Sequence, residues 1–231
     1  MQRAAVAAIA LLVPVLLVGN GIYVLTHEWF IRFEYGRSGF PDDAYGMPTG
    51  ERTQLAATSL RSILPWQREG IDLLREARLA DGSAAFGSRE LAHMQDVRRL
   101  LLVLLTLHAA TLVALVVLAV RAQTRPLATS ALNAGAAFTL VLFAFVGLLL
   151  AVNAVWFLTG FHTIFFEGSS WRFAETDTLR RLFPDRFWSD TALILGVGAA
   201  LQAAAILVAA NWTQVRRLTG SAHRAAPGRR S

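Results

Sequence analysis

Residues 100–120 read LLLVLLTLHAATLVALVVLAV, a run without a single charged side chain. At about 1.5 Å per residue, a helix of this length covers about 30 Å, the thickness of the hydrocarbon core of a bilayer. Lipid offers the backbone no hydrogen-bond partners, so a spanning segment satisfies its own amides by forming a helix. The run therefore predicts a transmembrane helix.

Composition and three further apolar runs extend this prediction to the whole chain. Hydrophobic residues make up 55% of the sequence and charged residues only 16%, well below the quarter that is typical of soluble domains. We expect an all-α membrane protein with four transmembrane helices. The predicted segments are helix 1–25, an extracytoplasmic cap 26–99, helix 100–120, a cytoplasmic loop 121–130, helix 131–158, an extracytoplasmic loop 159–190, helix 191–210 and a basic cytoplasmic tail 211–231.

The first run has a second interpretation, a secretory signal peptide that begins near Arg3. A signal peptide has an apolar core of about 7–15 residues followed by a small-x-small cleavage site. The run from Ala4 to Leu25 is longer and lacks a convincing site of this kind. We therefore expect a retained helix.

The arginines predict the orientation of the bundle. The N-terminus, the loop 121–130 and the C-terminal tail together carry eight arginines and no acidic residue. The segments 27–99 and 159–190 instead mix fourteen arginines with sixteen carboxylates. Purely basic segments stay in the cytoplasm, so both termini are expected there. The net charge of +6 is then a topology signal and an attraction to anionic lipid, and nucleic-acid binding is not expected.

The cap is predicted to be mainly helical. Apolar residues recur at helical spacing from Leu55 to Leu64, and Pro65 ends that pattern. A shorter helix is expected over residues 69–79, followed by a turn at 81–83. Ser88 is the expected N-cap of a helix that continues through residues 89–99 into the next span.

The second extracytoplasmic loop is rich in aromatic residues. Residues 163–166 and 171–173 flank Glu167-Gly168-Ser169-Ser170, which is compatible with one short β-hairpin. Asp177 or Thr176 is expected to cap a short helix that Pro184 ends. Most of these aromatic side chains also fit a simpler role as anchors at the level of the lipid head groups.

Candidate chemistry rests on two histidines, because cysteine is absent and no nucleotide-binding, zinc-protease or serine-nucleophile motif occurs. His93 precedes the apolar run at 100 by seven residues, and His162 follows the run ending at 158 by four. Both are expected at the same membrane interface. Glu90 and Asp96 share a helix face with His93, where they are expected to hold the imidazole and raise its pKa.

The histidines also have simpler interpretations that involve no catalysis. Interfacial histidines often only anchor a helix, and the spacing lacks the three or four clustered ligands of a zinc site. His108, in the middle of a span, is expected to make a packing hydrogen bond inside the bundle, as are Asn133, Asn153 and Gln202.

Two stretches resemble a known family. Residues 88–97 read SRELAHMQDV and fit the pattern E-x-x-H-M-x-D-V. Residues 161–166 read FHTIFF and are followed by Trp171 and by DTLRRLFP at residues 177–184. In this order, on a four-span plan, the motifs resemble those of the bacterial lipoprotein intramolecular transacylase (Lit) family. The resemblance is loose in the first span and at the start of the cap.

The resemblance implies a reaction on bacterial lipoproteins whose N-terminal cysteine carries a diacylglyceryl group. Family members move the sn-2 acyl chain to the α-amino group of that cysteine, which leaves an N-acyl lyso-lipoprotein. It implies catalytic roles for His93 and His162. The residues expected to support them or to bind substrate are Arg89, Glu90, Asp96, Glu167 and Trp171.

The implied site lies at the outer face of the cytoplasmic membrane, where it meets lipoprotein and membrane lipid; no cofactor and no metal are expected. Two other functions remain open from the sequence. One is a non-catalytic membrane protein whose cap binds a lipid or a partner, and the other is a metal-dependent membrane hydrolase.

Overall fold

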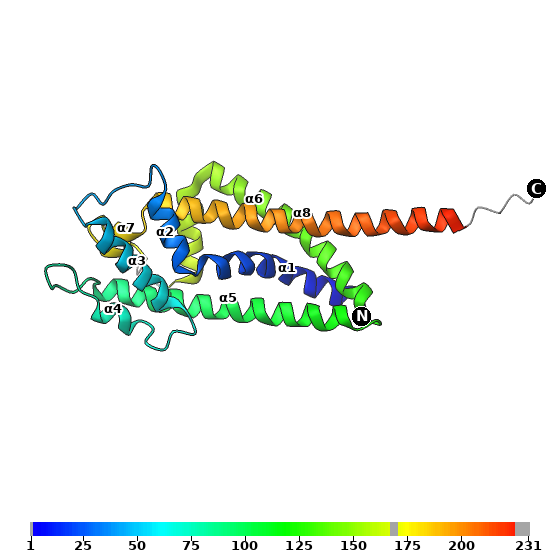
Figure 1. Cartoon of the computed structure of the whole chain (residues 1–231), viewed down its shortest axis with the longest axis horizontal. Helices are drawn as coiled ribbons and strands as arrows, with labels where there is room; N and C mark the ends of the chain where they lie inside the picture. Colours follow the sequence, from blue (N-terminus) through cyan, green and yellow to red (C-terminus); the bar gives the residue numbers. More distant parts are fainter. Residues whose placement is uncertain (1, 167–170, 225–231) are drawn as a thin grey trace, which may run out of the picture.

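Four long helices form a bundle, and four short helices form a cap at one end of it (Figure 1). The computed structural model describes residues 2–166 and 171–224. In these ranges the helices are α1 (Gln2–Leu25), α2 (Glu28–Gly36), α3 (Thr49–Ile63), α4 (Asp72–Glu76), α5 (Ser88–Val120), α6 (Arg125–Phe165), α7 (Thr178–Leu182) and α8 (Asp185–Arg224).

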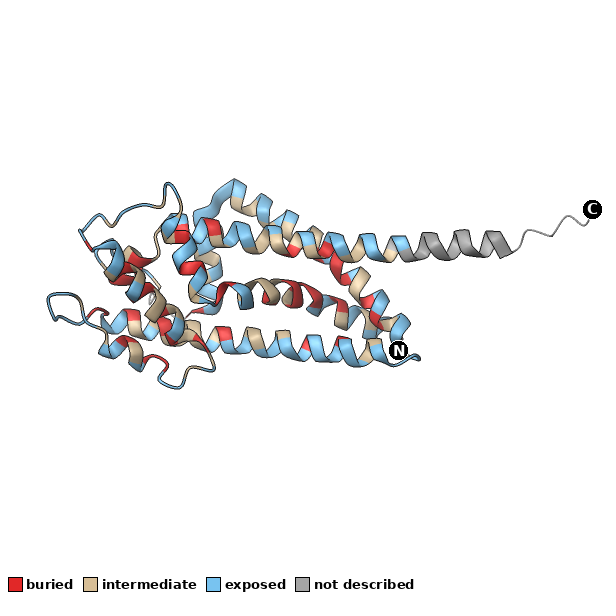
Figure 2. Cartoon of the chain, viewed as in Figure 1, coloured by how far each residue is buried: buried red, intermediate tan, exposed pale blue. Residues whose placement is uncertain are grey.

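The long helices α1, α5, α6 and α8 each contain a stretch long and apolar enough to cross a membrane. Within α5 the apolar, membrane-spanning part is residues 100–120, and the charged N-terminal turns belong to the cap. Buried residues concentrate on α1 and in the cap, whereas much of α5 and of the described part of α8 is exposed (Figure 2). Within the membrane-spanning parts the exposed side chains, such as Val113 and Leu201, are mostly apolar, as contact with lipid requires. The predicted fold class is confirmed.

Small residues let α1 lie at the centre of the bundle, in contact with α5, α6 and α8. Val13 of α1 is fully buried, and a Cβ atom added to Gly135 of α6 would come within 2.4 Å of the Val13 Cβ. Such close approach of two backbones compensates for the weak hydrophobic driving force between helices in lipid.

A polar chain crosses the bundle and joins three helices. His108 Nε2 lies 2.8 Å from Asn20 Oδ1, and Asn20 Nδ2 donates to Gln202 Oε1 at 2.7 Å. Gln202 Nε2 in turn donates to the Leu17 carbonyl. The predicted packing role of His108 and Gln202 is therefore confirmed.

Helix α6 is kinked at Asn153, where φ is −160° and ψ is 90°. Asn153 does not join the bundle interior as expected: it is exposed, and its Oδ1 accepts the backbone N–H of Trp156 at 2.9 Å. The side chain thus caps the restarted helix. The kink redirects the last turns of α6, which carry His162.

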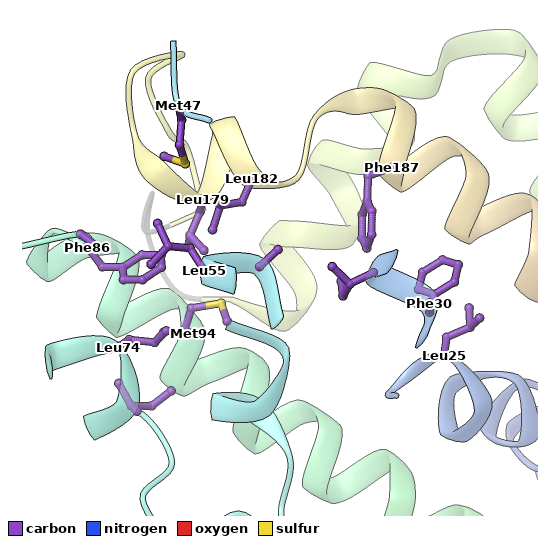
Figure 3. Close-up of a cluster of buried hydrophobic side chains, with 14 residues drawn as sticks. Leu25, Phe30, Met47, Leu55, Leu74, Phe86, Met94, Leu179, Leu182 and Phe187 are labelled. Atoms are coloured by element: carbon purple, nitrogen blue, oxygen red, sulfur yellow. The ribbon is translucent and has the colours of Figure 1, made fainter. Parts of the chain in front are cut away.

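The cap has its own hydrophobic core, built from Phe30, Leu74 and Leu182, which are almost fully buried, and eleven further residues (Figure 3). Helix α3 buries Leu55, Ala56 and Ser59, as predicted, and ends before Pro65. Helix α4 is shorter than expected. This core fixes the cap against the start of α5 through Met94.

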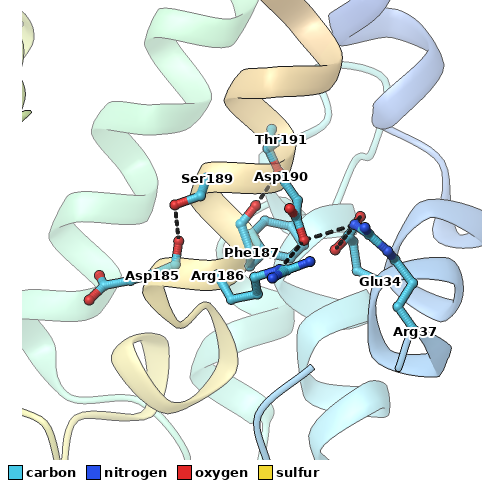
Figure 4. Close-up of polar contacts among 8 residues, drawn as sticks. All are labelled: Glu34, Arg37, Asp185, Arg186, Phe187, Ser189, Asp190 and Thr191. Carbon is cyan, nitrogen blue, oxygen red and sulfur yellow. Dashed lines mark hydrogen bonds and ion pairs between the residues drawn. The ribbon is translucent and has the colours of Figure 1, made fainter. Parts of the chain in front are cut away.

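An ionic cluster ties α2 to the start of α8 (Figure 4). Arg37 Nη1 contacts the buried Glu34 carboxylate at 3.2 Å and Asp190 at 2.8 Å. Arg186 Nε contacts the same Asp190 oxygen at 2.6 Å. Two guanidinium groups therefore compensate two carboxylates that have little access to water.

Two sequence predictions in the loops are wrong. The hairpin is not formed by the described residues, because α6 continues through Phe165 and so takes up all but the last residue of the first predicted arm, 163–166; residues 167–170 lie outside the described ranges. The N-cap of α5 is Gly87 instead of Ser88. The carboxylate of Glu90, three residues further on, accepts a hydrogen bond from the Gly87 N–H. A side chain of the helix itself thus satisfies this N–H at the helix start.

Candidate active site

His93 stands on α5 above the membrane-spanning part. The helix is continuous from Ser88, so the separation of seven positions between His93 and the start of the apolar run at residue 100 places His93 roughly 10 Å beyond that run. Its ring lies between Phe166, at 4.9 Å between centroids, and Phe173, at 5.2 Å in an edge-on contact. His93 is thus held among aromatic side chains instead of in open solvent.

His162 lies on the last turn of α6. Its Nδ1 is 2.7 Å from the Leu158 carbonyl. A carbonyl can only accept a hydrogen bond, so Nδ1 carries the proton, and in the neutral ring Nε2 is left as an acceptor. The ring stacks on Trp171 with centroids 4.6 Å apart and an interplanar angle of 27°.

Phe166 brings the two histidines together, because its ring contacts both His93 and His162, the latter at 5.6 Å. Phe166, Trp171 and Phe173 form what we call the aromatic cage. Among the described residues no hydrogen bond joins the two imidazoles directly. His162 is nevertheless close enough to His93 to affect it electrostatically across the cage.

Burial, together with a smaller effect of the nearby His162, lowers the pKa of His93 from its ordinary value to about 4, against an opposite effect of Asp96. The sequence-based expectation of a raised pKa is therefore wrong, because desolvation outweighs the carboxylate. His93 is neutral at pH 7. Its Nδ1 is buried without a partner in the described part of the chain.

Glu90 does not hold His93 as expected. Its two carboxylate oxygens accept the backbone N–H groups of Gly87 and Leu179, each at 2.7 Å. It therefore joins the start of α5 to the start of α7, residues far apart in the sequence. Burial raises the pKa of the Glu90 carboxyl, while the two backbone hydrogen bonds lower it. Asp96 is paired with Arg99 at 3.1 Å.

Arg89 anchors the segment 171–177 across the cage. Its Nη2 contacts Asp177 at 2.7 Å, and its guanidinium lies over the Phe173 ring at 5.8 Å. Asp177 also accepts the Ala174 N–H within the same segment. The contact of Phe173 with His93 and the ion pair of Asp177 with Arg89 were not foreseen from the sequence. For Asp177 the signal was the downstream part of the second motif.

Trp171 completes the cage, with a face that packs on His162 and an indole N–H that is buried. Within the described ranges, no acceptor lies within hydrogen-bond distance of Trp171 Nε1. Glu167, the other expected supporting residue of this loop, lies outside the described residues. Two grooves along α3 reach neither histidine and are not part of this site.

The arrangement can move protons. It offers one imidazole kept neutral by burial and another with a defined tautomer, both at the end of the membrane-spanning helices. His93 Nδ1 and Trp171 Nε1 are buried among the aromatic side chains, and burial strengthens electrostatic interactions at these atoms.

Comparison with known proteins identifies the family. Residues 6–188 match the family described as lipoprotein intramolecular transacylase Lit. A protein of Aquifex aeolicus (strain VF5) is 29% identical over 197 residues, which cover 85% of this chain and 88% of the relative.

The fold is similar to the solved structure of the membrane integral lipoprotein intramolecular transacylase Lit from Bacillus cereus. The TM-score is 0.72 at 16% identity, with 97% of this chain and 99% of the other covered. A variant of that protein, with one histidine replaced by arginine, matches with a TM-score of 0.70, also at 16% identity, with 95% of each chain covered. The family match extends over most of the chain and includes both histidine motifs, and the chain therefore belongs to the lipoprotein intramolecular transacylase (Lit) family of membrane acyltransferases.

Proposed function

We propose that the chain transfers the sn-2 acyl chain of a diacylglyceryl-cysteine lipoprotein to the α-amino group of that cysteine. The observation that carries the proposal is the meeting of His93 and His162, from two distant motifs, against one ring, Phe166. Family membership supports acyl transfer, and the paired imidazoles supply the proton transfers that this reaction needs.

The substrate brings its own nucleophile, so the enzyme needs no serine or cysteine. The amino nitrogen attacks the ester carbonyl carbon, a C–N bond forms, and the ester C–O bond breaks. The nitrogen loses protons and the glyceryl oxygen gains one. Holding both reacting groups of one molecule in place removes much of the entropic cost of the reaction.

The neutral state of His93 fits the first proton transfer. The α-ammonium has a pKa of about 8 in water, and it must lose a proton before it can attack. The same desolvation that keeps His93 neutral also lowers the pKa of an ammonium brought beside it. His162 Nε2 is a second acceptor, so the two rings can share the transfers. Arg89 and Glu90 act by positioning the 171–177 segment and α7, and Asp96 through its field on His93.

We place the cap and the aromatic cage on the outer side of the cytoplasmic membrane, with both termini in the cytoplasm. The mixed charges of the cap and the purely basic segments at the opposite end support this orientation. Lipoproteins are anchored in the outer leaflet, so their modified N-termini lie at this depth.

The test is mass spectrometry of lipoprotein N-termini from a host that otherwise makes the diacyl form. Expression of the chain should convert them to the N-acyl monoacylglyceryl form. A host that expresses the chain well and keeps only the diacyl form would contradict the proposal and favour a binding role for the cap.

A further inference from the structure

The transfer proposed above creates a negative charge that the histidines do not compensate. When the amine attacks, the carbonyl π electrons move onto oxygen and form a tetrahedral oxyanion. Transacylation in a water-poor site therefore needs a preorganised hydrogen-bond donor aimed at that oxygen. The following inference rests on the proposed function, because it concerns the same reaction.

The charged side chains that flank the cage are already engaged. Arg89 is paired with Asp177 at 2.7 Å, and its guanidinium also covers Phe173. Arg172 lies with its guanidinium over the Trp171 ring, 5.0 Å from the ring centre. His162 Nδ1 donates to the Leu158 carbonyl. Arg89 Nη2 and His162 Nδ1 are therefore occupied, and Arg172 is an exposed residue that lies on the face of the indole ring.

Trp171 provides the missing donor. Its Nε1 is buried and has no acceptor among the described residues. An indole nitrogen can donate but never accept, so only an acceptor atom can satisfy it. Native proteins rarely leave such a group unpaired, and an unpaired donor at a reactive centre calls for an external acceptor. The partners of this nitrogen are expected among the atoms of a bound substrate.

The indole N–H of Trp171 is placed to donate to an acceptor atom that lies beside the two histidines. The indole stacks on His162 at 4.6 Å with an interplanar angle of 27°, so the N–H, which lies in the ring plane, runs nearly parallel to the imidazole. His93 Nδ1, the other unpartnered polar atom of the cage, meets the same ring, Phe166, that packs on His162. Two buried polar atoms, the Trp171 indole N–H and His93 Nδ1, thus line one site, each without a hydrogen-bond partner among the described residues.

We infer that the indole N–H of Trp171 donates a hydrogen bond to the carbonyl oxygen of the sn-2 ester and to the oxyanion that forms from it. No proton is transferred from the indole. When the intermediate collapses, the oxygen returns its electron pair to the carbonyl, the glyceryl oxygen leaves and takes a proton, and the amide remains. Arg172, above the indole face, adds positive potential at the same place.

The test separates the N–H from the ring that carries it. Purified protein in vesicles is given a synthetic lipopeptide with a diacylglyceryl-cysteine, and formation of N-acyl product is followed by mass spectrometry. Three forms are compared: unmutated protein, Trp171→Phe, and a form in which residue 171 is 3-benzothienylalanine, which keeps the bicyclic ring and replaces N–H by sulfur. Trp188→Phe, an exposed tryptophan of the cap region, is the matched control.

Loss of one oxyanion donor lowers kcat by about 10²–10³-fold. We expect this fall in both Trp171 forms, with KM and Tm little changed in the benzothienyl form and no fall in the control. A benzothienyl form as fast as the unmutated protein would overturn the inference, even if Trp171→Phe is slow, because the ring alone would then matter. Absence of product from the unmutated protein would instead refute the proposed reaction itself.

Discussion

At the scale of single residues, the pair His93 and His162 is the centre of the proposed reaction. His93→Ala and His162→Ala should each lower the rate of N-acyl product formation by at least about 10²-fold, the usual contribution of a general acid–base group. The double variant should be no slower than the worse single one, because groups that act as a unit do not add. Mass spectrometry of the lipopeptide product measures each rate.

His108→Leu is the contrasting substitution in the same helix. It removes the bond to Asn20 Oδ1 and leaves that oxygen unpaired, so Tm should fall by an amount equivalent to about 1 kcal/mol while the rate is largely retained. Near-normal rates in well-expressed His93→Ala and His162→Ala proteins would leave only an anchoring role for these residues.

The lowered pKa of His93 makes a prediction about stability and pH. In the unfolded chain the imidazole titrates near 6.5, and in the folded protein near 4. Between these values the unfolded state binds more protons, so the contribution of this group to stability is lost as the pH falls from 7 to 4. The decrease in Tm from pH 7.5 to pH 5 should therefore be smaller in His93→Gln than in the unmutated protein. Equal decreases would mean that His93 titrates normally.

Spacing on a helix predicted part of this site. It located Glu90 and Asp96 on the face of His93, but it could not show that Leu179, eighty-nine residues away, competes for the Glu90 carboxylate. Nor could it weigh burial against a nearby charge, which decides the pKa of His93. The hydrogen bond from Leu179 to Glu90 and the burial of His93 both depend on how the 171–177 segment packs. The sequence of this segment has no periodic pattern that would predict its packing.

At the scale of elements, the four apolar runs predicted the long helices well because lipid leaves a spanning backbone no alternative. The sequence was least informative at helix ends. Residues 163–165 have strand-like aromatic content, yet α6 continues through them because the kink at Asn153 starts a new helical stretch. Residues 163–165 are exposed, so their helical conformation follows from continuity with the preceding turns of α6.

The crossing of α1 and α6 makes a testable prediction at this scale. Gly135→Ala places a Cβ 2.4 Å from the Val13 Cβ and 2.8 Å from the Ala10 carbonyl oxygen, so the backbones must separate. We expect a loss of about 1–3 kcal/mol, the usual cost of overpacking, seen as a lower Tm in detergent. Gly147→Ala, on the same helix with nothing within 4 Å of the new atom, should leave Tm unchanged or slightly raised. Similar Tm values for the two variants would contradict the tight crossing.

At the scale of the whole molecule, the cap gathers at one end of the bundle, and the N-terminus and the turn between α5 and α6 lie at the other, towards which α8 also runs (Figure 1). The purely basic segments thus share one end, and the mixed-charge segments share the other. The separation follows from the order of the spans, because each span carries the chain to the opposite side of the membrane. This order can be inferred from the sequence alone. It is the basis of the proposed orientation.

Reporter fusions test that orientation directly. Fusions after Arg121 and after Arg217 should give a cytoplasmic signal, because arginine-rich ends are retained on that side. Fusions near Asp81, in the turn of the cap, and near Arg180, in α7, should give an external signal. As a control, Arg121 and Arg125 are replaced by Glu. This removes the positive charges of the loop 121–130 and leaves the cap unchanged. A cytoplasmic signal at Asp81 in the unmutated chain would place His93 and His162 at the inner face. Lipoproteins anchored in the outer leaflet would then be out of reach, and the proposed reaction could not occur at this site.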